Sequence, residues 1–301
     1  MDQPTKNQQR ALGVAAIFGV IVALVLGLIA GLIVGVAGIA VGVVVGALAA
    51  WAVVGTAWTT NLVLRLSRAE PADPDTFARL HNVVEGLCSP SGMAKPAIYV
   101  IDDTAPNALV VGRHPKDAAL AVTTGLLDLL DLLELEAVVA RELTLIKSGA
   151  IAPATVAVTT AGLPALLGDI CIRRRWWNGG RAGHPEDRAA GRSFLGAIGS
   201  AHLALSPLDS ALLRAALGPD LGPEADAAAA VMTRYPPGLA SAMERIGSAS
   251  TVVHAGLRST AHLWLAPPIA TDPAEGQFSE ANRLFVAHRS SVERIDALRE
   301  L

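Results

Sequence analysis

The sequence is poor in several residue types on which common functions depend. Its two cysteines, Cys88 and Cys171, lie far apart and form no Cys-x-x-Cys pair, so neither a disulfide framework nor a cysteine-based zinc site is indicated. Aromatic residues make up 4% of the chain and are nowhere interleaved with basic ones, as they often are on nucleic-acid surfaces. Charged residues make up 17%, and the net charge of −3 gives no bulk attraction to nucleic acid. We therefore expect no nucleic-acid partner.

Motifs for several catalytic chemistries are also missing. The sequence has no Gly-x-Ser-x-Gly nucleophile elbow, no phosphate-binding loop and no dinucleotide fingerprint. No two of its histidines are three or four residues apart, the spacing that puts two metal ligands on one helix face. His254 and His262 would share one side of a helix over two turns. Surface or interior histidines with hydrogen-bond partners are the commoner case, so spacing alone builds no metal site.

Charge is absent from one long stretch, residues 11–58, which follows a short polar N-terminus at residues 1–10. As a single helix this stretch would extend about 72 Å, whereas a bilayer core of roughly 30 Å needs about 20 residues per span. The stretch therefore predicts two transmembrane helices, with a reversal near Gly35–Gly38. A signal peptide is the competing interpretation, but its apolar core would be only about 7–15 residues long.

Glycines recur every four residues on both predicted spans. They form two ridges, at Gly27, Gly31 and Gly35 and at Gly38, Gly42 and Gly46. Small residues at this spacing let helix backbones approach closely in lipid. We expect the ridges to pack the two spans together, or to join copies of the chain into a homo-oligomer.

Basic residues flank the predicted spans on both sides. Lys6 and Arg10 precede the first span, and Arg65 and Arg68 follow the second. The positive-inside rule then places both flanks in the cytoplasm. The sequence predicts a multi-pass protein of the cytoplasmic membrane, with the lipid bilayer as a partner and the main domain in the cytoplasm.

Residues 70–301 have the composition of a folded domain. Asp73 is expected to cap a helix with Pro74 at its first position, and Asp131 with Glu134 forms a capping box for a later helix. Three apolar runs are predicted strands: Ile98–Ile101, Ala108–Val111 and Ala118–Val122. The predicted fold class is α+β and mainly helical, with a small β-sheet after an N-terminal helical hairpin.

A hydrophobic insertion interrupts this domain at about residues 150–217. Its first part, Ala150–Ile172, is long enough to cross a membrane but contains two prolines. Its second part is only half apolar, and each central charge there costs about 2.5–3.5 kcal/mol on insertion scales. A hairpin that packs on the domain or on the membrane surface is favoured over one that crosses.

The stretch Val138–Lys147, reading VVARELTLIK, is a faint match to a zinc helix. Such a helix reads His-Glu-x-x-His, with two ligands on one face and a glutamate that activates water. Here the glutamate is present as Glu142, but Arg141 and Leu145 hold the ligand positions. Spacing alone favours the interpretation that Glu142 is a solvated glutamate on an amphipathic helix.

Several stretches together strengthen this match. They resemble, in order, the HtpX-like membrane zinc metallopeptidases, relatives of the CAAX prenyl proteases. The resembling stretches are Ala78–Gly86, Lys95–Gly112, Ala121–Leu127, Glu134–Lys147, Ala225–Leu239, Ser259–Leu265 and Val286–Leu298. The resemblance extends over nearly the whole chain and implies a metallopeptidase-like domain that follows transmembrane helices.

The resemblance also implies a register for the site. The family's third zinc ligand is a glutamate three residues before an Ala-Asp pair, here Ala225-Asp226, and that position holds Gly222. Glu224 is near but out of register. With Arg141, Leu145 and Gly222 at the three ligand positions, the resemblance implies a degenerate zinc helix, an idle Glu142 and no metal cofactor. We expect Arg141 to pair with Asp226 or Glu224, since a lone buried charge is costly; an exposed Arg141 is the alternative.

Two further site assignments rest on the resemblance. The segment Asn107, Ala108, Leu109 and Val110 resembles the edge strand on which the family lays extended substrate. His288 matches a family histidine, although its neighbours differ.

Three functions remain open at this stage. The favoured one is a catalytically inactive homologue, a pseudopeptidase that binds proteins or membrane substrates; the resemblance adds a role in membrane-protein quality control. The second is an active zinc endopeptidase whose displaced site combines Glu142 and Glu224 with some of His254, His262 and His288. The third is a structural subunit of a membrane complex, assembled through the glycine ridges.

Overall fold

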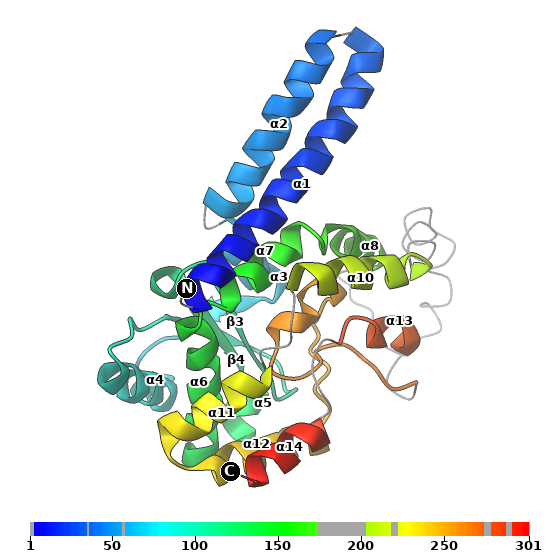
Figure 1. Cartoon of the computed structure of the whole chain (residues 1–301). Helices are drawn as coiled ribbons and strands as arrows, with labels where there is room; N and C mark the ends of the chain where they lie inside the picture. Colours follow the sequence, from blue (N-terminus) through cyan, green and yellow to red (C-terminus); the bar gives the residue numbers. More distant parts are fainter. Residues whose placement is uncertain are drawn as a thin grey trace.

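The structure is a computed structural model that describes residues 3–34, 36–55, 58–173, 203–217, 222–273, 278–286 and 291–300. Two helices, α1 (Gln3–Val34) and α2 (Val36–Gly55), lie side by side and project from the rest of the chain (Figure 1). Within the described residues, Lys6–Leu24 is long and apolar enough to cross a membrane, and Gly38–Leu48 is a shorter apolar helix. The two helices follow the uncharged stretch, while the crossing of a bilayer by both stays a prediction.

Gly27, Gly42 and Gly46 of the glycine ridges lie where α1 and α2 meet. A Cβ atom added at Gly42 would lie 2.3 Å from the Gly27 Cα, and one added at Gly46 would lie 2.4 Å from the Gly19 carbonyl oxygen. Both distances are too short for any larger residue. These three glycines therefore serve contact within one chain. Contact between chains stays a prediction, and Gly35 is outside the described residues.

A four-stranded mixed sheet follows, in the order β1-β2-β4-β3. β2 (Ala97–Ile101) and β4 (Ala119–Thr123) pair in parallel, and the antiparallel edges are β1 (Ala69–Pro71) and β3 (Ala108–Val111). The three predicted strands are confirmed. β1 was not predicted, because a three-residue strand with one apolar side chain shows no alternation.

Alternate strand residues bury against two different layers. Val110, Leu120 and Val122 belong to the larger core, which they share with helices α4, α6, α11 and α12. Leu109 and Ala121 point into a second core with residues of α3, α7 and η4. The helical elements of the domain are α3 (Trp58–Leu66), α4 (Ala78–Ser91), η1 (Pro115–Asp117), α5 (Thr124–Leu129), α6 (Leu132–Lys147), α7 (Ile151–Thr159), α8 (Leu163–Arg173), α10 (Ser206–Leu217), α11 (Gly222–Thr233), α12 (Pro236–Ser248), η4 (Arg258–Leu263), α13 (Ser279–Arg283) and α14 (Ser291–Arg299).

The two predicted helix starts have different outcomes. At α6, Asp131 accepts the Glu134 N–H at 2.9 Å and Glu134 accepts the Asp131 N–H at 3.0 Å, which confirms the capping box. At α4, the expected start at Asp73 is wrong. The Asp73 carboxylate binds Thr76 and stabilises a turn, and the helix begins only at Ala78.

The first part of the insertion is broken into two helices. α7 and α8 meet at a bend of 58°, and nearly all of α7 is buried. The Thr155 hydroxyl accepts the Gly112 N–H at 2.9 Å, which ties α7 to the end of β3. α7 therefore packs in the domain, while the α7–α8 pair is also apolar enough together to form a broken span or a re-entrant loop. Whether the insertion crosses a membrane stays a prediction, and its residues 174–202 lie outside the described residues.

Candidate functional site

Helix α6 carries the stretch that resembles a zinc helix. Its apolar residues Leu135, Val138 and Ile146 pack in the larger core. Arg141 and Glu142, between them in sequence, are 2% and 0% exposed, and α6 packs on α11. The expectation of a solvated glutamate or an exposed arginine on this helix is wrong.

Arg141 lies between two carboxylates. Its Nε donates to the Asp226 Oδ1 at 3.0 Å, and its Nη1 donates to the Glu142 Oε1 at 2.5 Å. The expected ion pair with Asp226 is therefore present. Of the two carboxylates considered, Glu224 is not the partner, because it is exposed on the first turn of α11.

A second arginine completes the arrangement. From α14, the Arg294 Nε donates to the Asp226 Oδ2 at 2.8 Å, and its Nη2 donates to Oδ1 at 2.9 Å. Glu142, Arg141, Asp226 and Arg294 thus form one buried row of alternating charge, here called the buried charge cluster. With all four ionised its net charge is zero, as the burial of charge requires.

The surroundings shift the protonation of three members. Burial disfavours a charged guanidinium, but the carboxylates of Glu142 and Asp226 outweigh it and raise the pKa of Arg141. Burial also opposes the charged form of Asp226, but the two arginines prevail and lower its pKa. For Glu142, burial prevails over Arg141 and raises its pKa. Within the cluster, the carboxyl of Asp226 therefore stays ionised more readily than that of Glu142, which binds a proton more readily.

Glu142 is the less satisfied carboxyl. Its Oε2 is buried and has no hydrogen-bond partner among the described residues, whereas both Asp226 oxygens accept bonds. Leaving a buried acceptor without a bond costs about 1–3 kcal/mol. The raised pKa and the unpaired oxygen have the same cause: the Glu142 carboxyl is fully buried and has a single hydrogen-bond partner, Arg141.

The two other positions that the family resemblance assigns to zinc ligands bring no metal donor. Leu145 packs against the larger core, and Gly222 is buried at the start of α11. Zinc sites use thiolate, imidazole or carboxylate ligands, and a guanidinium has no lone pair to give. In the parts of the chain that the structure describes, no three His, Cys, Asp or Glu residues gather as a metal site. The residues at these three positions do not fit zinc.

The histidines considered for a displaced site are held elsewhere. His254 contacts the Asp103 carboxylate through its Nδ1 at 3.0 Å and its N–H at 2.7 Å. The His262 Nε2 lies 2.8 Å from the Ala154 oxygen, and burial lowers the pKa of His262 to about 4. The two do not share one helix, as their spacing would have allowed, because His262 is on η4 and His254 precedes it. His288 lies outside the described residues.

The edge strand that resembles the family's substrate strand is covered. Its residues Asn107–Val110 are at most 3% exposed. The Leu265 N–H donates to the Ala108 oxygen at 2.8 Å, and Trp264 bridges to Leu109. The segment Trp264–Ala266, here called the covering segment, thus occupies the outer edge of β3. An extended peptide could add to this edge only by displacing it.

Asn107 fastens the covering segment with its side chain. Its Nδ2 donates to the Ala266 oxygen at 3.0 Å, and its Oδ1 accepts the Ala266 N–H at 3.1 Å. Arg294 reaches the same segment, because its Nη1 donates to the Leu265 oxygen at 3.3 Å. Sequence reasoning missed Arg294, since no spacing rule links an arginine in the last helix to an aspartate 68 residues earlier.

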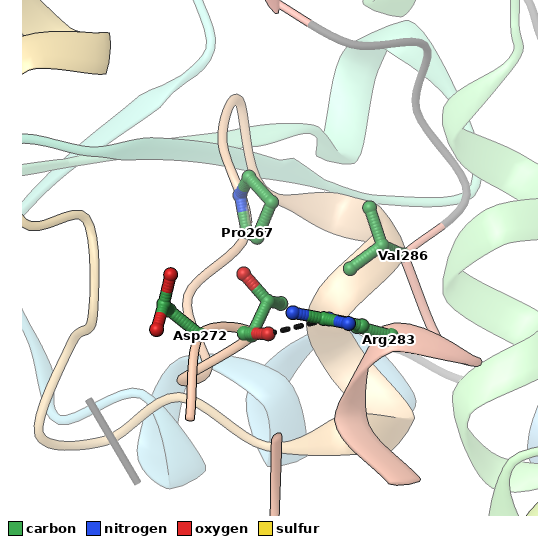
Figure 2. A pocket seen from close by; sticks show the side chains of 5 residues that line it. Pro267, Asp272, Arg283 and Val286 are labelled. Atoms are coloured by element: carbon green, nitrogen blue, oxygen red, sulfur yellow. Dashed lines mark hydrogen bonds between the residues drawn. The ribbon is translucent and has the colours of Figure 1, made fainter. Parts of the chain in front are cut away.

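A hollow of about 390 Å³ begins directly after the covering segment. It is lined by Pro267, Thr271, Asp272, Arg283 and Val286. Figure 2 shows the Arg283 side chain extended across it, where its Nε donates to the Thr271 oxygen at 2.7 Å. No member of the buried charge cluster lines this hollow.

Comparison with known proteins identifies relatives of the chain. A family profile described as Peptidase family M48 matches residues 74–301. A protein named Protease HtpX homolog from Thermoanaerobacter pseudethanolicus is 36% identical over 233 residues, which cover 77% of this chain and 75% of the relative. Its namesake from Dictyoglomus thermophilum is 38% identical over 239 residues, covering 79% and 74%. The namesake from Tropheryma whipplei is 33% identical over 253 residues, covering 84% and 82%. No solved structure gives a significant match.

Proposed function

Because the chain belongs to peptidase family M48 and is HtpX-like, we propose that it is a membrane-anchored pseudopeptidase. In this proposal it binds proteins or membrane substrates without cleaving them and contributes to membrane-protein quality control. The observation that carries the proposal is the pairing of Arg141 with Asp226 and Glu142 inside the fold. In the register set by the family resemblance, this guanidinium stands at a zinc-ligand position.

Electrostatics support the inactivity. Zinc lowers the pKa of a bound water towards 7, which lets a neighbouring glutamate activate it. A permanent cation at the ligand position gives no bond to a metal and repels one. Glu142 is bonded to that cation and fully buried, so its carboxyl is cut off from bulk solvent.

Membrane anchorage rests on α1 and α2. The Lys6–Leu24 part of α1 meets the length and hydropathy of a span, and large apolar side chains such as Leu24 and Leu28 are 67% exposed. Apolar side chains in such number on a projecting helix are costly in water and favourable in lipid. Basic residues at both flanks orient the domain to the cytoplasm in this proposal.

Metal content and proteolysis test the proposal together. The full chain, purified in detergent without chelators, is expected to hold no stoichiometric zinc by elemental analysis and to leave casein intact. A matched triple variant, Arg141→His with Leu145→His and Gly222→Glu, restores the family's three ligands and is expected to gain zinc. Stoichiometric zinc in the natural chain, with cleavage that is abolished by Glu142→Gln, would establish an active enzyme instead.

Partner binding separates the remaining alternative. Crosslinking in membranes is expected to capture a protein other than the chain itself. Self-association through the glycine ridges, with no other protein captured, would favour a structural subunit.

A further inference from the structure

Helix α10 turns a row of apolar side chains outward although part of its buried face is polar. It buries Ser206, Asp209 and Ser210 together with the apolar Leu213 and Ala216. Its outward row is Leu208, Ala211, Leu212 and Ala215, all exposed, continuing the exposed Leu205 that precedes the helix. A surface helix of a water-soluble domain turns charged and polar residues outward instead of a row of leucines.

The orientation of α10 is fixed by buried polar bonds. The Arg258 Nη1 donates to the Ser206 hydroxyl at 3.0 Å, and the Arg258 Nε donates to Asp169 of α8 at 2.6 Å. Rotating α10 to bury its outward leucines would break the bond to Ser206 and would expose Leu213, which is now buried. The outward row of α10 is therefore a built surface of the fold.

The outward row also carries little charge. Arg214 is the exposed charged residue of α10, and its guanidinium is tied back to the Leu284 oxygen and the Ser210 hydroxyl, both at 3.1 Å. Leu208 and Leu212 are 59% and 46% exposed, and Leu167 on the neighbouring α8 is 55% exposed. Both neighbouring helices thus expose large apolar side chains.

This surface lies at the base of the projecting helices. Leu217, at the end of α10, packs in one cluster with Val14 of α1, and its oxygen is 3.5 Å from the Arg10 Nη1. The exposed apolar residues of α1 begin at the same level, with Leu12 and Ile17. In Figure 1, α7, α8 and α10 lie at the end of the domain from which α1 and α2 project.

We propose that the outward row of α10, with Leu167 of α8, is a membrane-contact surface whose occupant is the lipid bilayer. A helix of 12 residues is about 18 Å long, too short for a core of roughly 30 Å, so α10 lies along the interface. Continuity with the lipid-exposed side chains of α1 favours lipid over a protein partner. The inference rests on the membrane anchorage in the proposed function.

Site-directed fluorescence in lipid tests this surface. Single-cysteine forms of the full chain, with Cys88→Ala and Cys171→Ala, carry an environment-sensitive dye after Leu208→Cys, Leu212→Cys, Ile17→Cys or Val231→Cys. Val231 of α11 is the matched control, because it is 78% exposed and apolar but lies away from α1. The proteins are placed in vesicles whose lipids carry a quencher near the headgroup or near the chain end.

The surface predicts a blue shift and quenching at Leu208 and Leu212, stronger with the quencher near the headgroup, and neither change at Val231. Quenching at Ile17 but not on α10 would overturn the contact and leave the anchorage standing. Stronger quenching by the chain-end quencher would mean that α10 crosses the bilayer, and would overturn its placement along the interface. A blue shift without quenching would mean a protein contact. Absence of quenching at Ile17 as well would remove the anchorage, while zinc content and casein cleavage would still test inactivity independently.

Discussion

Asp226 is the residue on which the buried charge cluster depends. It accepts bonds from Arg141 of α6 and Arg294 of α14, and so links three helices through one carboxylate. Removing one partner from a buried ion pair costs more than the pair contributes, because the other partner is left charged and dry. Asp226 leaves two such partners.

The first prediction follows from this position. Asp226→Asn should lower the free energy of unfolding of the full chain by about 3–5 kcal/mol, measured by denaturant unfolding in detergent. The control is Glu224→Gln, two residues away and exposed, which should stay within about 0.5 kcal/mol of the natural chain. Equal stabilities of the two variants would contradict the role of Asp226.

His262 gives the chain a dependence on acid. Burial lowers its pKa from 6.5 to about 4, so between these values the unfolded chain binds a proton that the folded chain refuses. Stability from this group is therefore present above pH 6.5 and is lost as the pH falls towards 4, by about 3 kcal/mol. His262→Gln keeps a donor for the Ala154 oxygen but does not titrate. The difference in unfolding free energy between the two proteins should grow with acid over this window and stay flat if His262 is not buried.

The buried charge cluster could be predicted only in part from the sequence. The carboxyl partner of Arg141 was narrowed to two candidates because a buried cation needs a counter-charge and α11 was placed by resemblance. The sequence did not predict whether Arg141 is buried or exposed, because arginine is seldom buried. Arg294 and the covering segment were not foreseen, because contacts between distant segments leave no periodic mark on either.

At the scale of elements, runs with a clear period were predicted well. The strands β2, β3 and β4 and the capping box of α6 follow from local pattern. Elements whose limits depend on neighbours were not: β1 forms only by pairing with β2, and α4 begins after a turn that Asp73 holds. The α7–α8 run was interpreted as one apolar segment because hydropathy does not record a bend.

The contact of α1 with α2 depends on the absence of side chains. Gly42→Leu should force the helices apart, because its Cβ would lie 2.3 Å from the Gly27 Cα. Spin labels on a pair of cysteines replacing Ile17 and Val45 should report a longer distance between the helices. The control is Gly13→Leu, whose Cβ would meet no atom within 4 Å. An unchanged distance in the Gly42 variant would show that the two helices are not in contact.

At the scale of the whole molecule, the projecting helices are docked on the domain and not merely tethered to it. Ala11 and Ala15 of α1 pack with Ala152 and Val156 of α7. The Asn7 side-chain amide donates to the Ser148 oxygen at the C-terminus of α6 at 3.0 Å. Helix α1 thus contacts the helix that carries Arg141.

Enlarging this small-residue contact should loosen the docking. Ala15→Phe should cost about 1–3 kcal/mol by overpacking and speed hydrogen–deuterium exchange of the α7 amides. Ala16 is the matched control, because it neighbours Ala15 but is exposed. Exchange that is equally fast in Ala15→Phe and Ala16→Phe would mean that the domain does not hold α1 by this face.

In evolution, the residues of the buried charge cluster and of the two neighbouring positions change by single substitutions. A histidine at position 141 could not by itself rebuild a metal site, because Leu145 and Gly222 supply no donor. It would also remove the permanent cation from Glu142, whose carboxyl is fully buried, and so yield a less stable intermediate. Two further substitutions would have to follow before metal binding could offset that loss. Under the proposed function, selection for a stable fold alone would therefore be enough to keep Arg141 in place.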